Sequence, residues 1–436
     1  MELLTGKIKD LYFRYFTAVF AGACIPCVYA LVDMAVIGKY HGPIGVAAMS
    51  VVIPIFNIIY SLGFLVGIGG SVLFSTQRGM GHSLNEQNQY FTSAAIGAVI
   101  LSLAVLCLCW GFEEELLVYF GADETLLPLS KAYLLPIKTA APVFLFVQLI
   151  SSFLRNDNAP ALATKAVTIS GIFNVFGDFF FVFGLDLGIF GAGLATGLGA
   201  LICLLVMLVH FASKDNTLAL VRVTHFFRRL FAIVMTGFST FFIDFAVGIV
   251  IVLFNRQIME YLGTDALAVF GILIQINIFV QCCGYSVGQA AQPILSVNFG
   301  AGRRDRIKET MHYASLTAAA LGVTWVILTL AFPNAFVHLF MKPTQSVLAI
   351  APAIIRTYGF AFLLIPFNVF STYYFQALMA EKAAFAVSMC RGLVICSILI
   401  LTLPVVFGAD TIWLSMPITE LLTAFFAVTL MKRHHA

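Results

Sequence analysis

Long apolar runs separated by short polar segments dominate the chain. A helix of about 20 apolar residues is long enough to cross the hydrocarbon core of a bilayer. We therefore predict an all-α integral membrane protein with about twelve transmembrane helices. Their predicted positions are 14–37, 46–74, 90–112, 129–153, 161–183, 189–211, 231–254, 264–294, 311–335, 348–373, 383–406 and 412–431.

The composition supports the same class. Of the 436 residues, 61% are hydrophobic and 10% are charged, and the mean hydropathy is +0.99. Soluble domains carry roughly 25% charged residues, so the composition excludes an ordinary soluble protein. The net charge of +3 is small and gives no indication of nucleic-acid binding. The nine cysteines mostly fall inside apolar runs, where they are expected to pack as small apolar residues.

The positions of the basic residues predict the orientation, because loops on the cytoplasmic side are enriched in Lys and Arg. With a cytoplasmic N-terminus, 18 of the 24 basic residues fall on the inner side. Both termini are therefore predicted to be cytoplasmic. The six basic residues left on the outer side are Lys39, Lys131, Lys138, Arg256, Lys342 and Arg356.

The chain also repeats itself at a constant offset. Gly42 pairs with Gly263, Gly63 with Gly284, and Gly79 with Gly300, without a change of register. A duplicated unit with an even number of spans keeps its orientation, so the repeat axis runs along the membrane normal, as in some transporters. We predict a six-helix N-lobe at 1–212, a basic cytoplasmic linker at 213–230 and a six-helix C-lobe at 231–436.

One polar set is absent from the second copy. At the same offset, Asp33 pairs with Phe254, Asn174 with Ile395, and Asp178 with Leu399. An acid inside a membrane helix is costly and marks a functional site by default. Because the second copy lacks these residues, the duplicated scaffold does not itself require them.

Four residues of the N-lobe are predicted to form a cation site. Asn174 and Asp178 are four apart and share a helix face; Asp33 lies in the first span and Thr196 in the sixth. Their oxygens suit Na⁺, and a proton suits the same carboxylates. Each residue also has a purely structural alternative, above all Thr196, since threonine commonly bonds back to its own helix. Asp244 and Glu420 are further intramembrane acids, expected either to line a cavity or to serve structure.

At these residues the chain resembles the multidrug and toxic compound extrusion (MATE) family. The resemblance rests on Gly63 with Gly79-Met-Gly81, on Gly284 with Asn298-Phe-Gly300-Ala-Gly302, and on the stretch from Arg155 through Pro160 to Asp178 and Thr196.

The resemblance implies a twelve-helix, two-lobe exporter driven by entry of H⁺ or Na⁺. It places the cation site at Asp33, Asn174, Asp178 and Thr196, and it suggests that Tyr29 and Gln148 line the N-lobe cavity. Some branches of the family use acids of the seventh and tenth spans instead. Asp244 is an acid in the seventh span, but 348–372 contains none, which favours the N-lobe site.

The predicted function is export of amphipathic, mostly cationic drugs in exchange for H⁺ or Na⁺, by a working monomer in lipid, with no other cofactor. The alternative is a flippase for lipid-linked oligosaccharides, which is disfavoured because Lys and Arg form no cluster inside the spans. An enzyme is disfavoured because no catalytic grouping is evident in the membrane. A passive channel is disfavoured because the parallel repeat is typical of alternating access.

Overall fold

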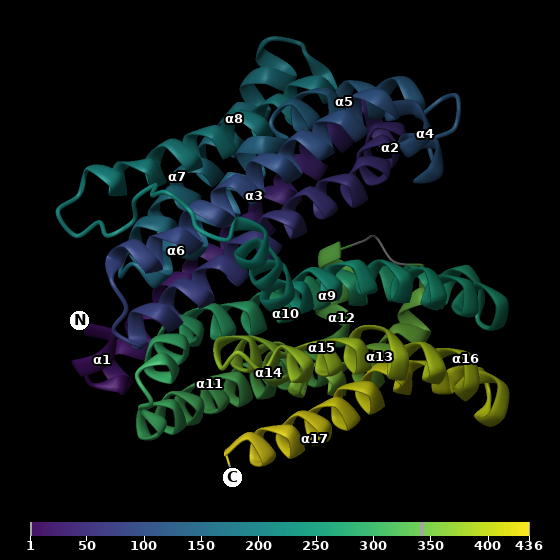
Figure 1. The fold of residues 1–436 in the computed structure, drawn as a ribbon. Coiled ribbons are helices and arrows are strands. Elements are labelled where there is room, and N and C mark those ends of the chain that lie inside the picture. The colour runs from purple at the N-terminus through teal and green to yellow at the C-terminus, as the bar shows by residue number, and fades with distance from the viewer. Residues whose placement is uncertain (1, 341–343, 436) are drawn as a thin grey trace. The chain divides into compact units, whose positions relative to one another are not determined.

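A computed structural model describes residues 2–340 and 344–435 of the chain, and every regular element in them is a helix (Figure 1). Within helices, some side chains are not described: Glu2, Cys24, Cys27, Val28, Pro43, Ile243, Asp244, Phe245, Thr264, His434 and His435.

The first half of the chain forms the helices that carry the predicted cation site. They are α1 (Glu2–Thr5), α2 (Ile8–Gly79), α3 (Leu84–Gly111), α4 (Glu113–Tyr119), α5 (Leu127–Thr139), α6 (Ala141–Asn156), α7 (Pro160–Asp178), the π-helical η1 (Phe179–Gly184), α8 (Gly188–Leu208) and the short η2 (Val209–Ala212).

The second half repeats this order with small changes. Its elements are α9 (Phe226–Tyr261), α10 (Gly263–Gly300), α11 (Arg304–Ala331), α12 (Pro333–Phe340), α13 (Gln345–Gly359), η3 (Phe360–Leu363), α14 (Ile365–Ala377), α15 (Glu381–Met389), the π-helical η4 (Cys390–Val394), α16 (Ile395–Phe407), η5 (Ala409–Leu414) and α17 (Ser415–His435).

Helix ends follow the local sequence. The long α2 is broken at Gly42, whose φ of +65° is a conformation that glycine adopts without a steric penalty. We call Ile8–His41 the first arm of α2; it contains the predicted span 14–37. At the start of α3, Ser83 and Glu86 form a reciprocal capping box, which satisfies backbone donors left free by the first turn.

Ten helices in the described residues are long and apolar enough to cross a membrane. The pair α5 and α6 makes an eleventh span, bent by 49° at the break between the two helices. Pro136 and Pro142 flank that break, and proline removes a backbone donor from a helix. The described residues thus hold ten or eleven such spans, all of them helical, which agrees with the all-α membrane architecture of about twelve spans predicted above.

The duplication is visible in the helix boundaries. α7 begins at Pro160 and α15 begins at Glu381. α6 ends at Asn156 and α14 ends at Ala377. Both pairs of boundaries are related by the offset that relates the paired glycines. The offset read from the first two spans of each copy therefore also holds for the fourth and fifth spans.

The chain divides into two compact units. The first comprises 1–5, 17–241 and 296–302, and the second comprises 6–16, 242–295 and 303–436. The linker and the beginning of α9 thus belong to the first unit. The exact lobe boundaries predicted from the sequence remain a prediction.

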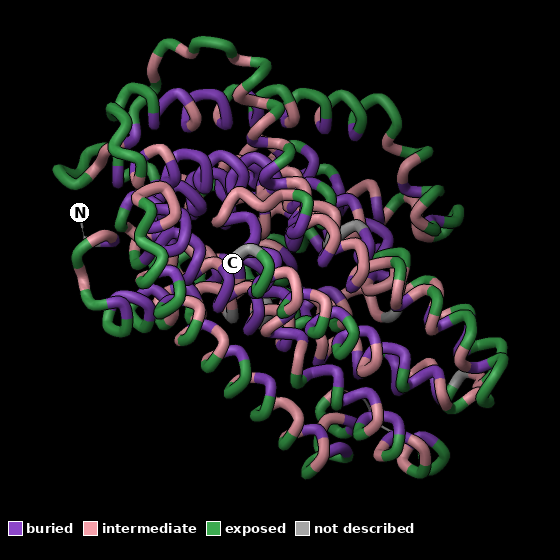
Figure 2. Tube along the Cα trace, turned by 60° about the horizontal axis from the view of Figure 1, so that its bottom comes forward, coloured by how far each residue is buried: buried purple, intermediate pink, exposed green. Residues whose placement is uncertain are grey.

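Many large apolar side chains are exposed along the helices, while others form a continuous core (Figure 2). Leu103 on α3 is 57% exposed and Val405 on α16 is 68% exposed. Such extensive apolar exposure marks a membrane-facing surface. The core of the first unit includes Val36, Val52, Ile137 and Leu145, which bury the faces of α2, α5 and α6 against one another.

Two glycines related by the repeat touch each other inside the first unit. A Cβ added to Gly79 would lie 2.0 Å from the carbonyl oxygen of Val297 and 2.9 Å from Cα of Gly300. A Cβ on Gly300 would lie 2.1 Å from the carbonyl oxygen of Thr76. Thr76 and Val297 are themselves related by the offset of the repeat, so the two helices meet here through equivalent residues of the two copies.

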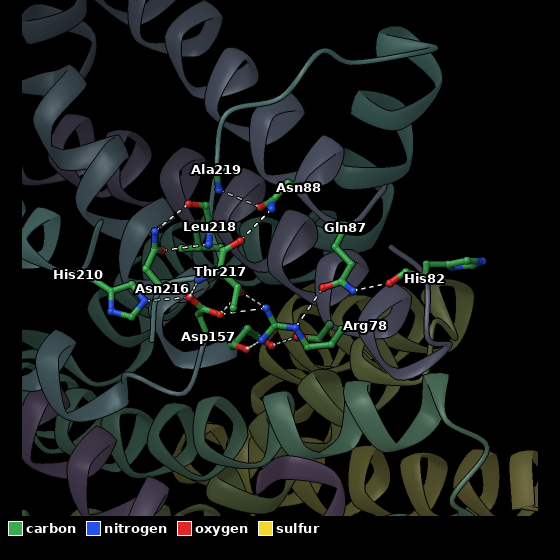
Figure 3. A network of polar contacts seen from close by, with 12 residues as sticks. Arg78, His82, Gln87, Asn88, Asp157, His210, Asn216, Thr217, Leu218 and Ala219 are labelled. Atoms are coloured by element: carbon green, nitrogen blue, oxygen red, sulfur yellow. Dashed lines mark hydrogen bonds and ion pairs between the residues drawn. The ribbon is translucent and has the colours of Figure 1, made fainter. Parts of the chain in front are cut away.

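The segment after α8 is fixed to the first unit by a buried polar network (Figure 3). Asp157, directly after α6, accepts hydrogen bonds from His210 Nε2 and from the Thr217 backbone N–H, each at 2.9 Å. It also pairs with Arg78 at 2.9 Å. Asn88 donates to the Thr217 carbonyl at 2.8 Å and accepts from Ala219 N–H at 3.1 Å. The linker therefore begins as a docked part of this unit.

Candidate functional site

Asp178 is the last residue of α7 and is completely buried. Neither of its carboxylate oxygens has a hydrogen-bond partner within the described residues. A buried carboxylate without partners is strongly disfavoured in its charged form. Binding of a proton or a cation would neutralise this side chain. The π-helical η1 follows at once, and π-helical turns inside α-helices are frequent at functional sites.

Asp33 lies in the first arm of α2 and is 4% exposed. Its Oδ2 accepts a hydrogen bond from the hydroxyl of Tyr133 on α5 at 3.0 Å, whereas its Oδ1 has no partner in the described part of the chain. The carboxyls of Asp33 and Asp178 are close enough to repel each other when both are ionised. The two acids therefore behave as one site rather than as two independent groups.

Asn174 and Thr196 meet beside the acids. Asn174 Nδ2 donates to Thr196 Oγ1 at 3.3 Å, and Thr196 Oγ1 donates to the carbonyl oxygen of Ala192 at 3.1 Å. The bond from Thr196 to its own helix is the structural alternative noted above, yet this hydroxyl also serves Asn174. The Oδ1 of Asn174 has no partner among the described residues.

Small residues allow α7 and α8 to approach closely here. A Cβ on Gly199 would lie 3.3 Å from Ser170 Oγ and 3.7 Å from Asn174 Cβ, and a Cβ on Gly177 would lie 3.1 Å from Ala195 Cβ. Close backbone approach through glycine is typical of membrane helix pairs. It brings the Asn174 side chain within reach of α8.

A pocket adjoins these residues. Asn174 and Thr196 are part of its wall, and so is Tyr29, which the family resemblance places at the cavity. The remaining lining is mostly apolar or aromatic. Its other residues are Pro26, Tyr60, Phe144, Val147, Val167, Ser170, Ala200 and Cys203.

Gln148 does not reach that pocket wall. It follows Val147 on α6, is 5% exposed, and its Cβ would lie 2.9 Å from a Cβ placed on Gly63. The structure thus places Gln148 at the packing contact between α6 and α2.

Two acids are predicted in the C-lobe, Asp244 and Glu420, and the structure describes the side chain of only the second. The side chain of Asp244 lies outside the described residues. Glu420 on α17 is fully buried, and its Oε1 pairs with Arg391 Nε at 2.9 Å. Asn368 Nδ2 donates to Glu420 Oε2 at 2.6 Å. Glu420 is therefore neutralised within its own unit.

The structure adds one residue that sequence reasoning missed. Tyr133 is buried at the site and is the hydrogen-bond donor of Asp33. A tyrosine in an apolar span carries no strong signal of its own, because tyrosine also packs as an ordinary aromatic residue.

The donor atoms fit a hard cation or a proton. The partnerless oxygens belong to Asp33, Asn174 and Asp178, and hard cations prefer carboxylate and carbonyl oxygens. Within the described residues, no group of three or more His, Cys, Asp or Glu side chains is placed to hold a metal ion.

Comparison with known proteins identifies the family of the chain. The MatE family model matches residues 18–180 and 238–402. The chain is 23% identical over 413 residues to the multidrug export protein MepA of Staphylococcus saprophyticus, covering 94% of this chain and 90% of that protein. MepA of Staphylococcus aureus is 22% identical over the same length.

Solved structures share the fold. An outward-facing multidrug resistance MATE transporter aligns with a TM-score of 0.92 at 19% identity, over 100% of this chain and 97% of that one. A transporter of the MOP superfamily from Pyrococcus furiosus, described as having a binding pocket of reverse polarity, aligns with a TM-score of 0.91 at 19% identity and the same coverage. With the family model matched in both halves of the repeat, the chain belongs to the MATE family of membrane transporters.

Proposed function

We propose that this protein is a secondary active exporter that moves amphipathic organic cations out of the cell in exchange for H⁺ or Na⁺. The observation that carries the proposal is the buried pair Asp33 and Asp178, three of whose four carboxylate oxygens lack a protein partner within the described residues. A coupling ion bound there neutralises the pair and relieves their repulsion.

The position of the pocket supports competition between ion and substrate. Asn174, one turn before Asp178, carries an oxygen without a partner in the described residues and also lines the pocket with Thr196. Pro26 lines it too, about two turns before Asp33 in the same arm of α2. Ion binding at Asp33 therefore changes the helix that forms part of the substrate wall, and a ligand shifts such an equilibrium only through different affinity for the two states.

The pocket has a volume of only about 30 Å³ in this structure and must widen to admit a drug, but its lining is of the kind that attracts organic cations. Tyr29, Tyr60 and Phe144 offer aromatic faces, which attract organic cations. No Lys or Arg is among its described lining residues. This favours drugs over the lipid-linked oligosaccharides of the alternative, flippase function, whose anionic diphosphate would need basic partners. The MepA relatives are multidrug export proteins by name, which agrees with this choice.

The test is transport by the purified protein in proteoliposomes. A pH gradient and a Na⁺ gradient are imposed separately, and efflux of a fluorescent organic cation is followed. We expect one gradient to drive efflux in the wild type. An asparagine side chain cannot take up and release a proton, and it lacks the negative charge that attracts Na⁺. We therefore expect Asp178→Asn to reduce coupled efflux by at least about tenfold.

Glu124→Gln is the matched control, since Glu124 is an exposed carboxylate in a connection and its loss should leave efflux unchanged. Full coupled efflux by Asp178→Asn would refute the proposed site. Transport of an anionic lipid-linked sugar, together with no efflux of organic cations, would instead support the flippase. The proposal also places the protein as a monomer in the prokaryotic inner membrane with both termini cytoplasmic.

A further inference from the structure

The end of the first arm of α2 is fastened to the connection between η1 and α8. The backbone N–H of Ile189 donates to His41 Nε2 at 3.2 Å, and the Tyr40 hydroxyl donates to Asp186 Oδ1 at 2.5 Å. Lys39 lies over the ring of Phe183, with Nζ 6.0 Å from the ring centroid. Three consecutive side chains therefore contact the segment 183–189.

The connection is shaped to admit these side chains. Gly188 has a φ of +54°, and a Cβ on it would lie 2.7 Å from His41 Nε2 and 2.9 Å from Tyr40 Cε1. Asp186 also has a positive φ, +55°, which is uncommon for a residue other than glycine. Any larger residue at 188 would push His41 away from Ile189.

The His41 bond exists only with a neutral imidazole. A ring nitrogen that accepts a hydrogen bond carries no proton, so Nε2 must be bare and Nδ1 protonated. The Ile189 N–H belongs to the first turn of α8, whose unsatisfied donors carry partial positive charge. Protonation of Nε2 would set two N–H groups against each other at a positive helix end, and the contact would break.

This fastening joins the two carboxylate-bearing helices. His41 follows Asp33 by eight residues in the same arm, and the 183–189 segment contains the end of η1, which directly follows Asp178. Releasing His41 loosens the end of the Asp33 helix relative to the Asp178 helix, with the Tyr40–Asp186 bond still in place.

The repeat offers a comparison within the chain. At the offset of the repeat, Tyr40 pairs with Tyr261, but His41 pairs with Leu262, Asp186 with Phe407 and Gly188 with Ala409. The histidine, its neighbouring acid and the permissive glycine therefore occur only in the half that holds Asp33 and Asp178.

We propose that His41 is a proton-operated latch that positions the Asp33 helix against the Asp178 helix. When His41 is neutral the latch is closed; when it is protonated the latch opens. Histidine is the side chain whose charge normally changes between pH 5 and 8. The charged groups on the two contacting segments are Lys39, over Phe183, and Asp186, bonded to Tyr40. Tyr40, bonded to Asp186, remains as a second fastening.

Hydrogen exchange of the Ile189 amide in the full-length protein tests the latch directly. Wild type is compared with His41→Gln at each pH from 8 to 5.5, so that the intrinsic pH dependence of exchange cancels. Glutamine keeps a side-chain acceptor but cannot be protonated. We expect equal protection at pH 8 and, at pH 5.5, exchange in the wild type faster by about fivefold, the equivalent of one net hydrogen bond. A ratio that does not change with pH overturns the latch.

Transport then tests the positioning role, which rests on the proposed function. The pH is lowered on the side of the membrane where His41 lies, which the predicted orientation makes the outside. We expect the wild-type rate relative to His41→Gln to change severalfold across this range, and His82→Gln, a control at an exposed histidine in a connection, to keep the wild-type profile. A constant rate ratio despite pH-dependent exchange overturns the positioning role. Wild type without any efflux would refute the exporter, while the exchange result would still decide the latch.

Discussion

The carboxyls of Asp33 and Asp178 differ in one respect: only Asp33 has a hydrogen-bond donor within the described residues, the hydroxyl of Tyr133. A donor to a carboxylate stabilises its charged, ion-free form and occupies one of the oxygens that an incoming ion would use. Tyr133 therefore sets how readily Asp33 gives up a coupling ion.

Tyr133→Phe removes that donor and keeps the ring. Hydrogen bonds to charged groups contribute about 1.5–3 kcal/mol, so we expect the apparent affinity for the coupling ion to rise by at least about tenfold. Turnover should fall because the ion leaves more slowly. The measurement is the dependence of efflux rate on H⁺ or Na⁺ concentration in proteoliposomes. An unchanged half-maximal concentration would show that Tyr133 has only a packing role. Tyr119→Phe is a suitable control, because Tyr119 is 82% exposed.

Sequence reasoning reached Asp33, Asn174, Asp178 and Thr196 because burying polar atoms in lipid is expensive and the second copy lacks the first three. The structure joins Asn174 to Thr196 by a hydrogen bond and gives Asp33 an electrostatic effect on Asp178, so a cation site shared by all four residues remains a proposal. Tyr133 was missed because its hydroxyl is a minor part of a large apolar side chain. The contacts of the 40–41 pair were missed because their partners lie far along the chain, in the connection between the fifth and sixth spans and at the start of the sixth, and no periodicity links them.

Among the elements, α14, η4 and α17 are joined by the buried pair of Arg391 and Glu420 with Asn368. Removing one member of a buried ion pair leaves an uncompensated charge, whereas replacing both is often nearly neutral. This arrangement gives a direct test of whether Glu420 serves structure or transport.

Arg391→Met alone is expected to destabilise the protein by about 3 kcal/mol. Arg391→Met combined with Glu420→Gln should recover most of that loss, because no charge remains buried. Thermal unfolding in detergent measures both variants, and efflux measures their activity. If the double variant is stable but inactive, Glu420 has a transport role after all.

The linker network predicts a pH-dependent stability. Burial by itself raises the pKa of Asp157, but hydrogen bonds from His210 and Thr217 and the charge of Arg78 outweigh it, so the pKa is lowered. A carboxyl whose pKa is lower in the folded state stabilises that state above its ordinary pKa of about 3.9. This contribution is lost as the pH falls through the lower, folded value.

We therefore expect Asp157→Asn to lower the unfolding temperature clearly at pH 7 and to open residues 213–224 to proteolysis. The difference from wild type should shrink as the pH falls below about 4. Asp215→Asn, an exposed acid in the same segment, provides the comparison. A difference that stays constant down to the lowest accessible pH would contradict the role assigned to the Asp157 charge.

The bend in the fourth span shows what hydropathy does not encode. The predicted run 129–153 covers two helices that meet at an angle of 49°. The length of a hydrophobic run predicts that a span exists. The direction of the chain at Ala140 depends instead on two flanking prolines and on packing against α8. In the same way, η1 and η4 are π-helical although their sequences read as ordinary apolar helix.

For the whole molecule, the duplication was the most predictive feature of the sequence. An offset read from a few glycines recurs in helix boundaries far along the chain, because helix packing demands small residues at the same depth in both copies. The grouping into compact units was not predictable in this way. The boundary between the two units falls inside α9, because contacts between residues, and not their order in the chain, define the units.

Gly79→Ala tests the crossing of the two repeats inside the first unit. Its Cβ would meet the Val297 carbonyl at 2.0 Å, so the helices must separate. We expect a loss of about 1–3 kcal/mol in stability and a larger loss of efflux. Gly111→Ala is the control, because its added Cβ meets nothing within 4 Å. An unchanged unfolding temperature and unchanged efflux in Gly79→Ala would show that the two helices can move apart at this crossing without cost.

The pairing of Asp33 with Asp178 finally sets a thermodynamic ceiling on the proposed exchange. One site with two carboxyls takes up at most two positive charges per cycle. Each charge that crosses a potential of 100 mV contributes about 2.3 kcal/mol, which corresponds to a concentration ratio of about 50-fold. A monovalent organic cation leaving in exchange cancels one of the two. An exporter built on this single pair therefore sustains a steeper gradient for neutral or zwitterionic compounds than for cations at the same membrane potential.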